Sequence, residues 1–529
     1  MLLALSLLGT AHAGSCDALV SQVDTTLANV QDLCLTDALR GIQARAHEQG
    51  LDTCLQDRLA TEGLGLPADL PDLPAPPAPS VRDSFGVPNL YETEHFAIRW
   101  GNSGGPSTSQ AQQLGERFEA AWAREIEEMG FPQPAGTSQY KLNIYVGDTG
   151  NGTPSVYGNA GYFYQDSAGY PMIVMNRNLS NTRQFELTAA HEFFHSVQSV
   201  IDTYQYTGSG QGSWYYEASA SWIEIEVFPT NASYANMLMG WAYQPELPIN
   251  FFDYPDQGTL SEYHQYGAFI FVRYLAEFHG GWELIQRSFM EAPYNGDPML
   301  VLDDILAESG WTIEQAFYDF AARGAAWDFE HREWFDAIID AYGGWNSGYS
   351  HRPSGTVGSL DITYSPNEYL PETFGANYWQ VNRSLPDSFD LTFTGDTPAG
   401  WYVALEQRDG VTFTRYELQL DGPEGVLEVR DRPEADEAWI VVAATNGTTW
   451  TSGRTYDYSF QIAEVTEPVD TGEPVDTDEP VDTAEPVDTG DPEAPDDEVA
   501  GGCACSGSGL LPGAWVFLGA LGLLGRRRR

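Results

Sequence analysis

Two histidines and a glutamate lie within five consecutive residues, His191-Glu192-Phe193-Phe194-His195. On an α-helix, residues at positions i and i+4 share one face, so both imidazoles can reach a single ion. A neutral imidazole is a good ligand for Zn²⁺, and Glu192 projects beside the pair, where a zinc-bound water would sit. These residue types at this spacing predict a zinc site, with His191 and His195 as ligands and Glu192 as the base that takes a proton from water.

This chemistry requires a helix at the motif, and the surrounding sequence predicts one. No Pro or Gly interrupts Thr182 to Val200, and apolar side chains in this stretch supply a buried surface: Phe185, Leu187, Ala189, Ala190, Phe193, Phe194 and Val197. In a chain of 529 residues with nine histidines, a chance H-E-x-x-H is expected in roughly one chain per hundred. Two histidines and a glutamate on a buried helix need a partner, and a metal ion supplies one.

The zinc site needs a third ligand, and the spacing of that ligand separates the classes of zinc peptidase. The metzincin pattern requires Gly at position 198 and His at position 201, but this chain has Gln198 and Ile201. That class is therefore excluded. A second helix is predicted over Trp214–Glu224, after a glycine-rich loop, with Ser213 as its candidate N-cap.

Two glutamates on this second helix compete for the role of third ligand. We favour Glu217, because a short loop between antiparallel helices brings the start of the second helix near the end of the first. Glu224 lies on the same helix face and remains the rival.

The segment from Trp214 to Trp222 resembles the W-x-x-E-x-x-A-x-W segment of gluzincin zinc peptidases. The resemblance implies a His₂Glu site of His191, His195 and Glu217, with the fourth coordination position left for water. Many gluzincins carry Asp four residues after the glutamate ligand, where it orients a histidine. This chain has Ser221 there, and Glu224 is the candidate to take that role.

Stabilisation of the transition state needs a hydrogen-bond donor aimed at the developing oxyanion. The candidates are Tyr266 and His264, in an aromatic-rich helix that begins near Tyr263. Tyrosines in such runs are also common core residues, so the sequence leaves both readings open.

The chain carries a net charge of −51, and its acidic residues far outnumber its basic ones. Such a surface argues against nucleic acid or an anionic membrane as a partner. The N-terminal run Leu2–Leu8, followed by Ala11-His12-Ala13, resembles a signal peptide with an A-x-A cleavage site. Export permits disulfides, and Cys16, Cys34 and Cys54 allow one pair among them; Cys34–Cys54 is plausible, but the sequence does not fix the pairing.

Composition and periodicity divide the chain into six segments. After the signal peptide (1–13), residues 14–79 form a helical segment with a Pro-rich linker, either a propeptide or an N-terminal cap. Residues 80–345 form the zinc metallopeptidase domain, and residues 346–465 a β-sandwich domain that acts in binding or as a spacer. The stretch 466–500 is an acidic stalk that repeats Glu-Pro-Val-Asp-Thr, and residues 501–529 form a tail with a cysteine motif, an apolar helix and an arginine cluster.

The predicted fold class is an α+β zincin-like metallopeptidase domain with a mainly helical C-terminal half, followed by a β-sandwich domain. Strands are expected at 95–100, 140–146, 162–164 and 172–175, and an amphipathic helix at 110–129. In zincins an edge strand before the active-site helix binds extended peptide by adding it to the sheet. Helices are expected from Tyr263 to about Ile339. Short strands are expected at 402–405, 415–420, 425–429, 439–443 and 456–462.

The last 29 residues resemble the MYXO-CTERM sorting signal of myxobacteria, in which a cysteine motif precedes an apolar helix and an arginine cluster. Ala504 stands where glycine is usual between the cysteines. The resemblance implies that sorting and processing machinery acts on the tail near Cys503. The protein would then be exported to the cell surface at the outer membrane, or secreted after C-terminal processing.

Together these features predict an exported zinc endopeptidase of the gluzincin type, which hydrolyses extracellular proteins or peptides. A surface adhesin with a structural or vestigial zinc site is the alternative, and hydrolysis of a non-peptide amide is a third. Cleavage specificity, the oligomeric state and the role of the β-domain stay open at this stage, because the residues that shape a cleft lie on loops the sequence does not place.

Overall fold

The structure is a computed structural model of the whole chain. It describes residues 11–29, 35–68, 70, 76, 78–158, 160–179, 183–201, 204, 212–231, 233, 237–252, 260–294, 296–341, 351–420, 422–447 and 453–465. Most of the expected signal peptide, Cys34, much of the Pro-rich linker, the acidic stalk and the sorting tail lie outside these residues. In the part that is described, no helix is both long and apolar enough to cross a membrane.

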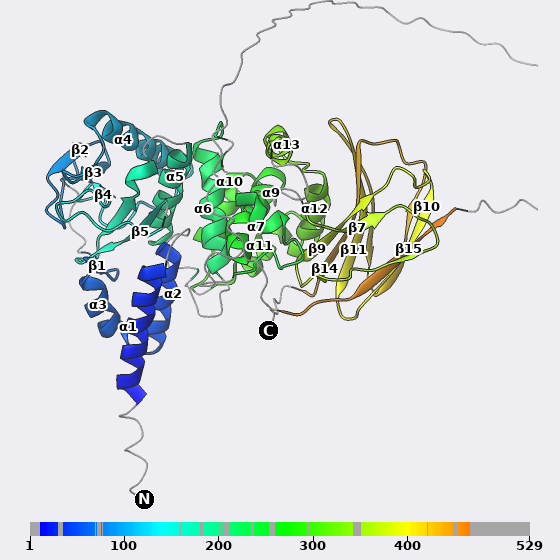
Figure 1. Ribbon diagram of the computed structural model, residues 1–529, viewed down its shortest axis with the longest axis horizontal. Helices are drawn as coiled ribbons and strands as arrows, with labels where there is room; N and C mark the ends of the chain where they lie inside the picture. Colours follow the sequence, from blue (N-terminus) through cyan, green and yellow to red (C-terminus); the bar gives the residue numbers. More distant parts are fainter. Residues whose placement is uncertain are drawn as a thin grey trace, which may run out of the picture. The chain divides into compact units, whose positions relative to one another are not determined.

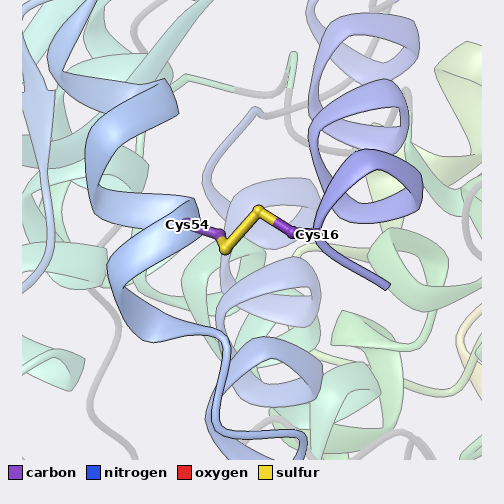
Figure 2. The surroundings of a disulfide bond; sticks show 2 residues. All are labelled: Cys16 and Cys54. Atoms are coloured by element: carbon purple, nitrogen blue, oxygen red, sulfur yellow. A yellow bond between two sulfur atoms is a disulfide. The ribbon is translucent and has the colours of Figure 1, made fainter. Parts of the chain in front are cut away.

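Three helices form an N-terminal block, which we define as residues 11–66: α1 (Ala11–Asn29), α2 (Leu35–Glu48) and α3 (Asp52–Ala60). A disulfide joins Cys16 of α1 to Cys54 of α3, with the two Cα atoms 5.9 Å apart (Figure 2). The plausible pair Cys34–Cys54 is therefore not the one that forms. The reason is that α1 and α3 pack against each other, which brings Cys16 to the side of Cys54.

A six-stranded sheet in the order β1-β5-β6-β4-β3-β2 packs against the N-terminal block, whose last residues supply β1 (Figure 1). Its strands are β1 (Leu64–Gly65), β2 (Asn89–Glu92), β3 (Phe96–Trp100), β4 (Leu142–Val146), β5 (Gly161–Asp166) and β6 (Pro171–Met175). Strands β3, β4 and β6 are parallel, whereas β5 runs antiparallel to β6. The short β1 pairs with the far end of β5 through two residues only.

Alternate residues of these strands serve two different cores, as the two-residue period of a strand requires. Ile98, Ile144, Phe163, Ile173 and Met175 pack on the side of helices α4 (Thr108–Trp122) and α5 (Arg183–Gln198). Their neighbours face the N-terminal block instead: Tyr145, Tyr162, Tyr164, Met172 and Val174. The sheet is therefore buried on both faces.

The helix expected over 110–129 begins with a capping box between Ser107 and Gln110. It does not stay α-helical to its end, because its last part is the π-helix η1 (Ala123–Glu128). A short 3₁₀ turn, η2 (Arg177–Leu179), precedes α5.

Beyond α5 the chain is helical, as expected. The elements are α6 (Ser213–Val227), α7 (Met239–Ala242), η4 (Leu260–Tyr263), α8 (His264–Gly267), α9 (Phe269–His279), α10 (Trp282–Met290), α11 (Pro298–Ala307), α12 (Ile313–Ala325) and α13 (Arg332–Ala341). Side-chain caps start two of them: Asp297 caps α11, and Thr312 with Gln315 forms a capping box on α12.

The C-terminal region contains two sheets, in the orders β13-β10-β15-β8 and β12-β11-β14-β9-β7. Their strands are β7 (Pro353–Val357), β8 (Thr363–Tyr364), β9 (Gly375–Val381), β10 (Phe389–Gly395), β11 (Gly400–Asp409), β12 (Thr412–Leu420), β13 (Glu424–Val429), β14 (Glu437–Thr445) and β15 (Tyr458–Glu464). Both sheets contribute to one apolar cluster, for example Phe393 and Ile462 from the first and Val403 and Val442 from the second.

The five-stranded sheet also packs its other face against α12. The Tyr318 ring stacks on Tyr402 with the ring centroids 5.2 Å apart, and the Tyr378 hydroxyl donates to the Ala321 carbonyl at 3.0 Å. Arg415 of β12 binds Glu406 of β11 and Asp319 of α12. The β-region therefore shares a core with the helices that precede it.

Candidate metal centre

Helix α5 packs the two phenylalanines of the motif into the core. Phe193 packs edge-to-face on Phe96 of β3 with ring centroids 5.4 Å apart, and Phe194 packs in the same way on Phe131 at 5.1 Å. These contacts anchor the middle of the motif to the core beneath the sheet. The imidazoles of His191 and His195 then lie together, with ring centroids 4.7 Å apart and the rings nearly perpendicular.

Glu217 of α6 faces both histidines. Its Oε2 lies 3.1 Å from Nε2 of His191, and its Oε1 lies 3.3 Å from Nε2 of His195. All three residues are buried, and one ligand atom from each lies within 4.8 Å of the others. The structure thus brings together the three residues predicted as metal ligands.

Glu224 meets the other nitrogen of the first histidine. Its Oε1 lies 3.0 Å from Nδ1 of His191, so the imidazole is held between two carboxylates. Burial lowers the pKa of His191, but Glu217 and Glu224 outweigh burial and raise it well above its usual value. Glu224 therefore stands where an orienting carboxylate would stand, while Ser221 has no hydrogen-bond partner for its Oγ among the described residues.

The second histidine is oriented by Gln198, which the sequence analysis noted only as a departure from the metzincin pattern. Nδ1 of His195 lies 2.7 Å from Oε1 of Gln198, and the amide nitrogen of Gln198 donates to the Tyr216 carbonyl at 3.0 Å. Because the amide nitrogen already donates, the amide oxygen accepts and Nδ1 of His195 carries the proton. The lone pair of His195 is thereby placed on Nε2, the atom that faces Glu217.

The donor set fits a zinc ion. Nε2 of His195 is buried and has no hydrogen-bond partner among the described residues. In the tautomer fixed by Gln198, this atom and the facing oxygen of Glu217 are both acceptors, so a cation between them satisfies both. Two imidazole nitrogens and a carboxylate oxygen are the ligands of many catalytic zinc sites.

Glu192, the predicted base, is only 2% exposed and follows His191 on the same turn of α5. The two oxyanion candidates differ in position. The Tyr266 ring lies 6.2 Å from the His191 ring. His264 instead packs on Phe251, and burial lowers its pKa to about 3, which keeps the imidazole neutral. Both ring nitrogens of His264 lack partners among the residues that the structure describes.

Two glycines allow the close packing that holds α8, and with it Tyr266, near the site. A Cβ on Gly240 would lie 1.9 Å from the Tyr263 carbonyl oxygen, and one on Gly267 would lie 2.4 Å from the Trp241 nitrogen. Neither distance is compatible with a side chain. The bare backbone at these two positions therefore sets the location of α8.

Sequence reasoning missed a buried carboxylate on the π-helix η1. Glu125 is 0% exposed, and neither of its oxygens has a hydrogen-bond partner among the described residues. Burial raises its pKa well above the usual value, and the charge of His191 partly opposes that shift. A signal was present, because Glu125 continues the buried stripe of Leu114, Phe118 and Ala121, where an acid is out of place.

The expected N-cap of α6 is wrong. Gly212 occupies the N-cap position, and Ser213 is the first helical residue, with its Oγ buried and without a partner among the described residues. Tyr204 packs directly against this glycine and leaves no room for a side chain, because a Cβ on Gly212 would lie 2.9 Å from the Tyr204 Cβ.

Comparison with protein families finds one match: residues 78–454 match the family model DUF6055, described as a family of unknown function. The match covers more than half of the chain, so the chain belongs to this family. It includes strands β2 to β6 of the sheet, the helices of the candidate site and most of the β-region, and it begins after the N-terminal block. No curated protein sequence matches the chain.

Proposed function

We propose that this protein is a zinc-dependent endopeptidase of the gluzincin type, which hydrolyses peptide bonds of extracellular proteins. One observation carries the proposal: Nε2 of both histidines of the H-E-x-x-H motif points at the carboxylate of Glu217 on the antiparallel helix α6. The sequence supports export, through the resemblance of its two ends to a signal peptide and a sorting tail.

The roles of the chain's own residues follow from their positions. His191, His195 and Glu217 would hold the zinc ion, which when bound lowers the pKa of a water molecule and polarises a carbonyl. Glu192 takes a proton from the attacking water and passes it to the leaving amine. Tyr266, whose ring lies near His191, is the candidate donor to the oxyanion, whereas the neutral His264, which packs on Phe251, is retained as a second candidate.

The buried environment supports this assignment of Glu192. Glu192 is 2% exposed. The neighbouring His191 is 6% exposed, and His195 and Glu217 are fully buried. Water is therefore largely excluded from the space in which the proton moves.

Replacing Glu192 by glutamine tests the mechanism. Glu192→Gln keeps the size and polarity of the side chain but removes the base, so we expect zinc content to stay at one ion per chain and hydrolysis of casein to fall by at least about 100-fold. Ser221→Ala on α6 is the matched control for a buried polar change and should keep its activity. If Glu192→Gln digests casein as fast as the parent, Glu192 is not the base.

A second measurement on zinc separates the peptidase from the adhesin alternative. An X-ray absorption spectrum of the zinc-loaded protein should show three protein ligands and one water. A fourth protein ligand, together with no hydrolysis of a peptide library, would favour a structural zinc site.

A further inference from the structure

The outer edge of β5 is the place where an extended peptide would join the sheet. Strand β5 runs antiparallel to β6 and lies directly against α5, whose Thr188 Cγ2 would be 3.3 Å from a Cβ on Gly161. Strand β1 covers only Gln165 and Asp166 of β5. The remaining edge, Gly161 to Tyr164, is left without a neighbouring strand among the described residues.

Helix α2 of the N-terminal block fills this edge at its centre. The Thr36 hydroxyl accepts a hydrogen bond from the Phe163 N–H and donates one to the Phe163 carbonyl, both at 2.9 Å. A neighbouring antiparallel strand would use the same two groups of Phe163 to pair with one of its own residues. A single buried side chain thus takes the place of a strand.

The same helix also reaches the opposite wall of the site. One turn after Thr36, the guanidinium of Arg40 lies over the Tyr216 ring, 4.1 Å from its centroid, and Tyr216 immediately precedes Glu217. Burial raises the pKa of Tyr164 on β5, and the charge of Arg40 partly opposes that shift, so Arg40 lies close to β5 as well. Helix α2 therefore spans from the strand edge to the helix that carries the candidate ligand (Figure 1).

The candidate site is closed in this arrangement. Exposure is 6% for His191, 2% for Glu192 and 0% for His195 and Glu217. A peptide chain cannot bring a carbonyl to these groups while they are covered.

We propose that the N-terminal block is an intramolecular inhibitor, which occupies the peptide-binding edge of β5 and holds the site closed. This inference rests on the proposed peptidase function. A helix satisfies its own backbone hydrogen bonds and presents no extended segment, so α2 blocks the edge without being a substrate.

The block is built to act as one piece. Its disulfide joins Cys16 to Cys54, both within the block, so among the described residues only the chain after residue 66 connects the block covalently to the rest (Figure 2). The family match starts at residue 78, beyond the block. Substrate binding then requires either displacement of Thr36 from Phe163 or a cut in the segment that joins the block to the sheet.

The test uses full-length protein with Thr36→Val, which keeps the shape of the side chain and removes both hydrogen bonds. Thr25→Val is the matched control, because the hydroxyl of Thr25 donates to the Ser21 carbonyl on an exposed face of α1 and makes no other hydrogen bond in the part of the chain that the structure describes. Losing two hydrogen bonds should raise peptide turnover on the order of tenfold over the control and speed hydrogen exchange of the Phe163 amide. Arg40→Met, which leaves Thr36 in place, should give a smaller rise.

A second measurement separates this proposal from the peptidase itself. Binding of a fluorescein-labelled casein peptide is measured in the Glu192→Gln background, where no turnover is needed. Thr36→Val should bind the peptide more tightly than Thr25→Val does. Equal peptide binding and equal exchange at Phe163 in the two variants would overturn the inhibitory role, whether or not the protein hydrolyses peptides. If Thr36→Val binds the peptide more tightly but the protein that keeps Glu192 hydrolyses none, the result would support the role of the β5 edge and count against the peptidase.

Discussion

The choice between Glu217 and Glu224 as third ligand leads to the most discriminating prediction. Both carboxylates touch His191, but on different nitrogens: Glu217 on Nε2 and Glu224 on Nδ1. Glu217 alone also faces His195. Replacing each by glutamine keeps the volume and removes the charge, so the two variants differ only in which position is altered.

The expected magnitudes differ by roughly one order. Four-ligand zinc sites in small peptides bind with about 10–16 kcal/mol, which is about 3–4 kcal/mol per ligand, so Glu217→Gln should weaken zinc binding roughly 100- to 1,000-fold. Loss of an orienting partner typically weakens binding about 10- to 100-fold, and we expect this range for Glu224→Gln. Ser221→Ala, on the same helix, should change the affinity by less than about threefold.

Zinc affinity is measured by competition with a chromophoric chelator at pH 7.5, and the Co²⁺-substituted proteins are compared by visible absorption. Glu217→Gln should change the Co²⁺ spectrum because a ligand is lost, whereas Glu224→Gln should largely preserve it. If Glu224→Gln weakens zinc binding more than Glu217→Gln and also alters the spectrum, the assignment of Glu217 is refuted.

Two further predictions concern residues that position histidines or titrate. Gln198→Met removes the acceptor for Nδ1 of His195 and should weaken zinc binding about 10- to 100-fold, and Gln198→Glu should restore most of it; unchanged affinity in the Met variant would contradict the orienting role. Burial lowers the pKa of His351 to about 3. As the pH falls below about 6.5, the unfolded chain therefore binds a proton at His351 that the folded chain does not bind, and the free energy of unfolding decreases. Between pH 7 and pH 4.5, His351 therefore lowers the free energy of unfolding by about 2–3 kcal/mol. In His351→Phe, the loss of stability between these two pH values, measured by urea unfolding, should be smaller by that amount.

Much of the site was predictable because its geometry is local. The spacing of His191 and His195 fixes their common face once the segment is helical, and the apolar residues around them make it helical. Glu217 was favoured over Glu224 by the short connection between antiparallel helices; in the structure Glu217 lies against both histidines and Glu224 against one, and the choice of ligand stays a prediction. The zincin-like identity of the domain and its zinc ion stay predictions.

The parts that could not be predicted depend on contacts between distant segments. Gln198 orients His195 only because α6 brings the Tyr216 carbonyl to its amide group. Likewise, β9 is buried on both faces, by the four-stranded sheet and by α12, so its sequence lacks the polar–apolar alternation of a half-buried strand. Thr36 gave no signal at all, because its importance comes from a strand more than a hundred residues later.

The arrangement of the polar atoms between α5 and α6 is our reason for proposing a cation rather than a closed hydrogen-bond network. A network that satisfied itself would place a donor opposite each acceptor. Here Gln198 fixes the proton of His195 on Nδ1, which turns the lone pair of Nε2 toward an oxygen of Glu217 at 3.3 Å. Two acceptors at this distance repel each other in a buried site. A divalent ion that binds Nε2 of both histidines and the Glu217 carboxylate removes that repulsion, and this is why we favour a metal centre over a vestigial cluster of buried polar residues.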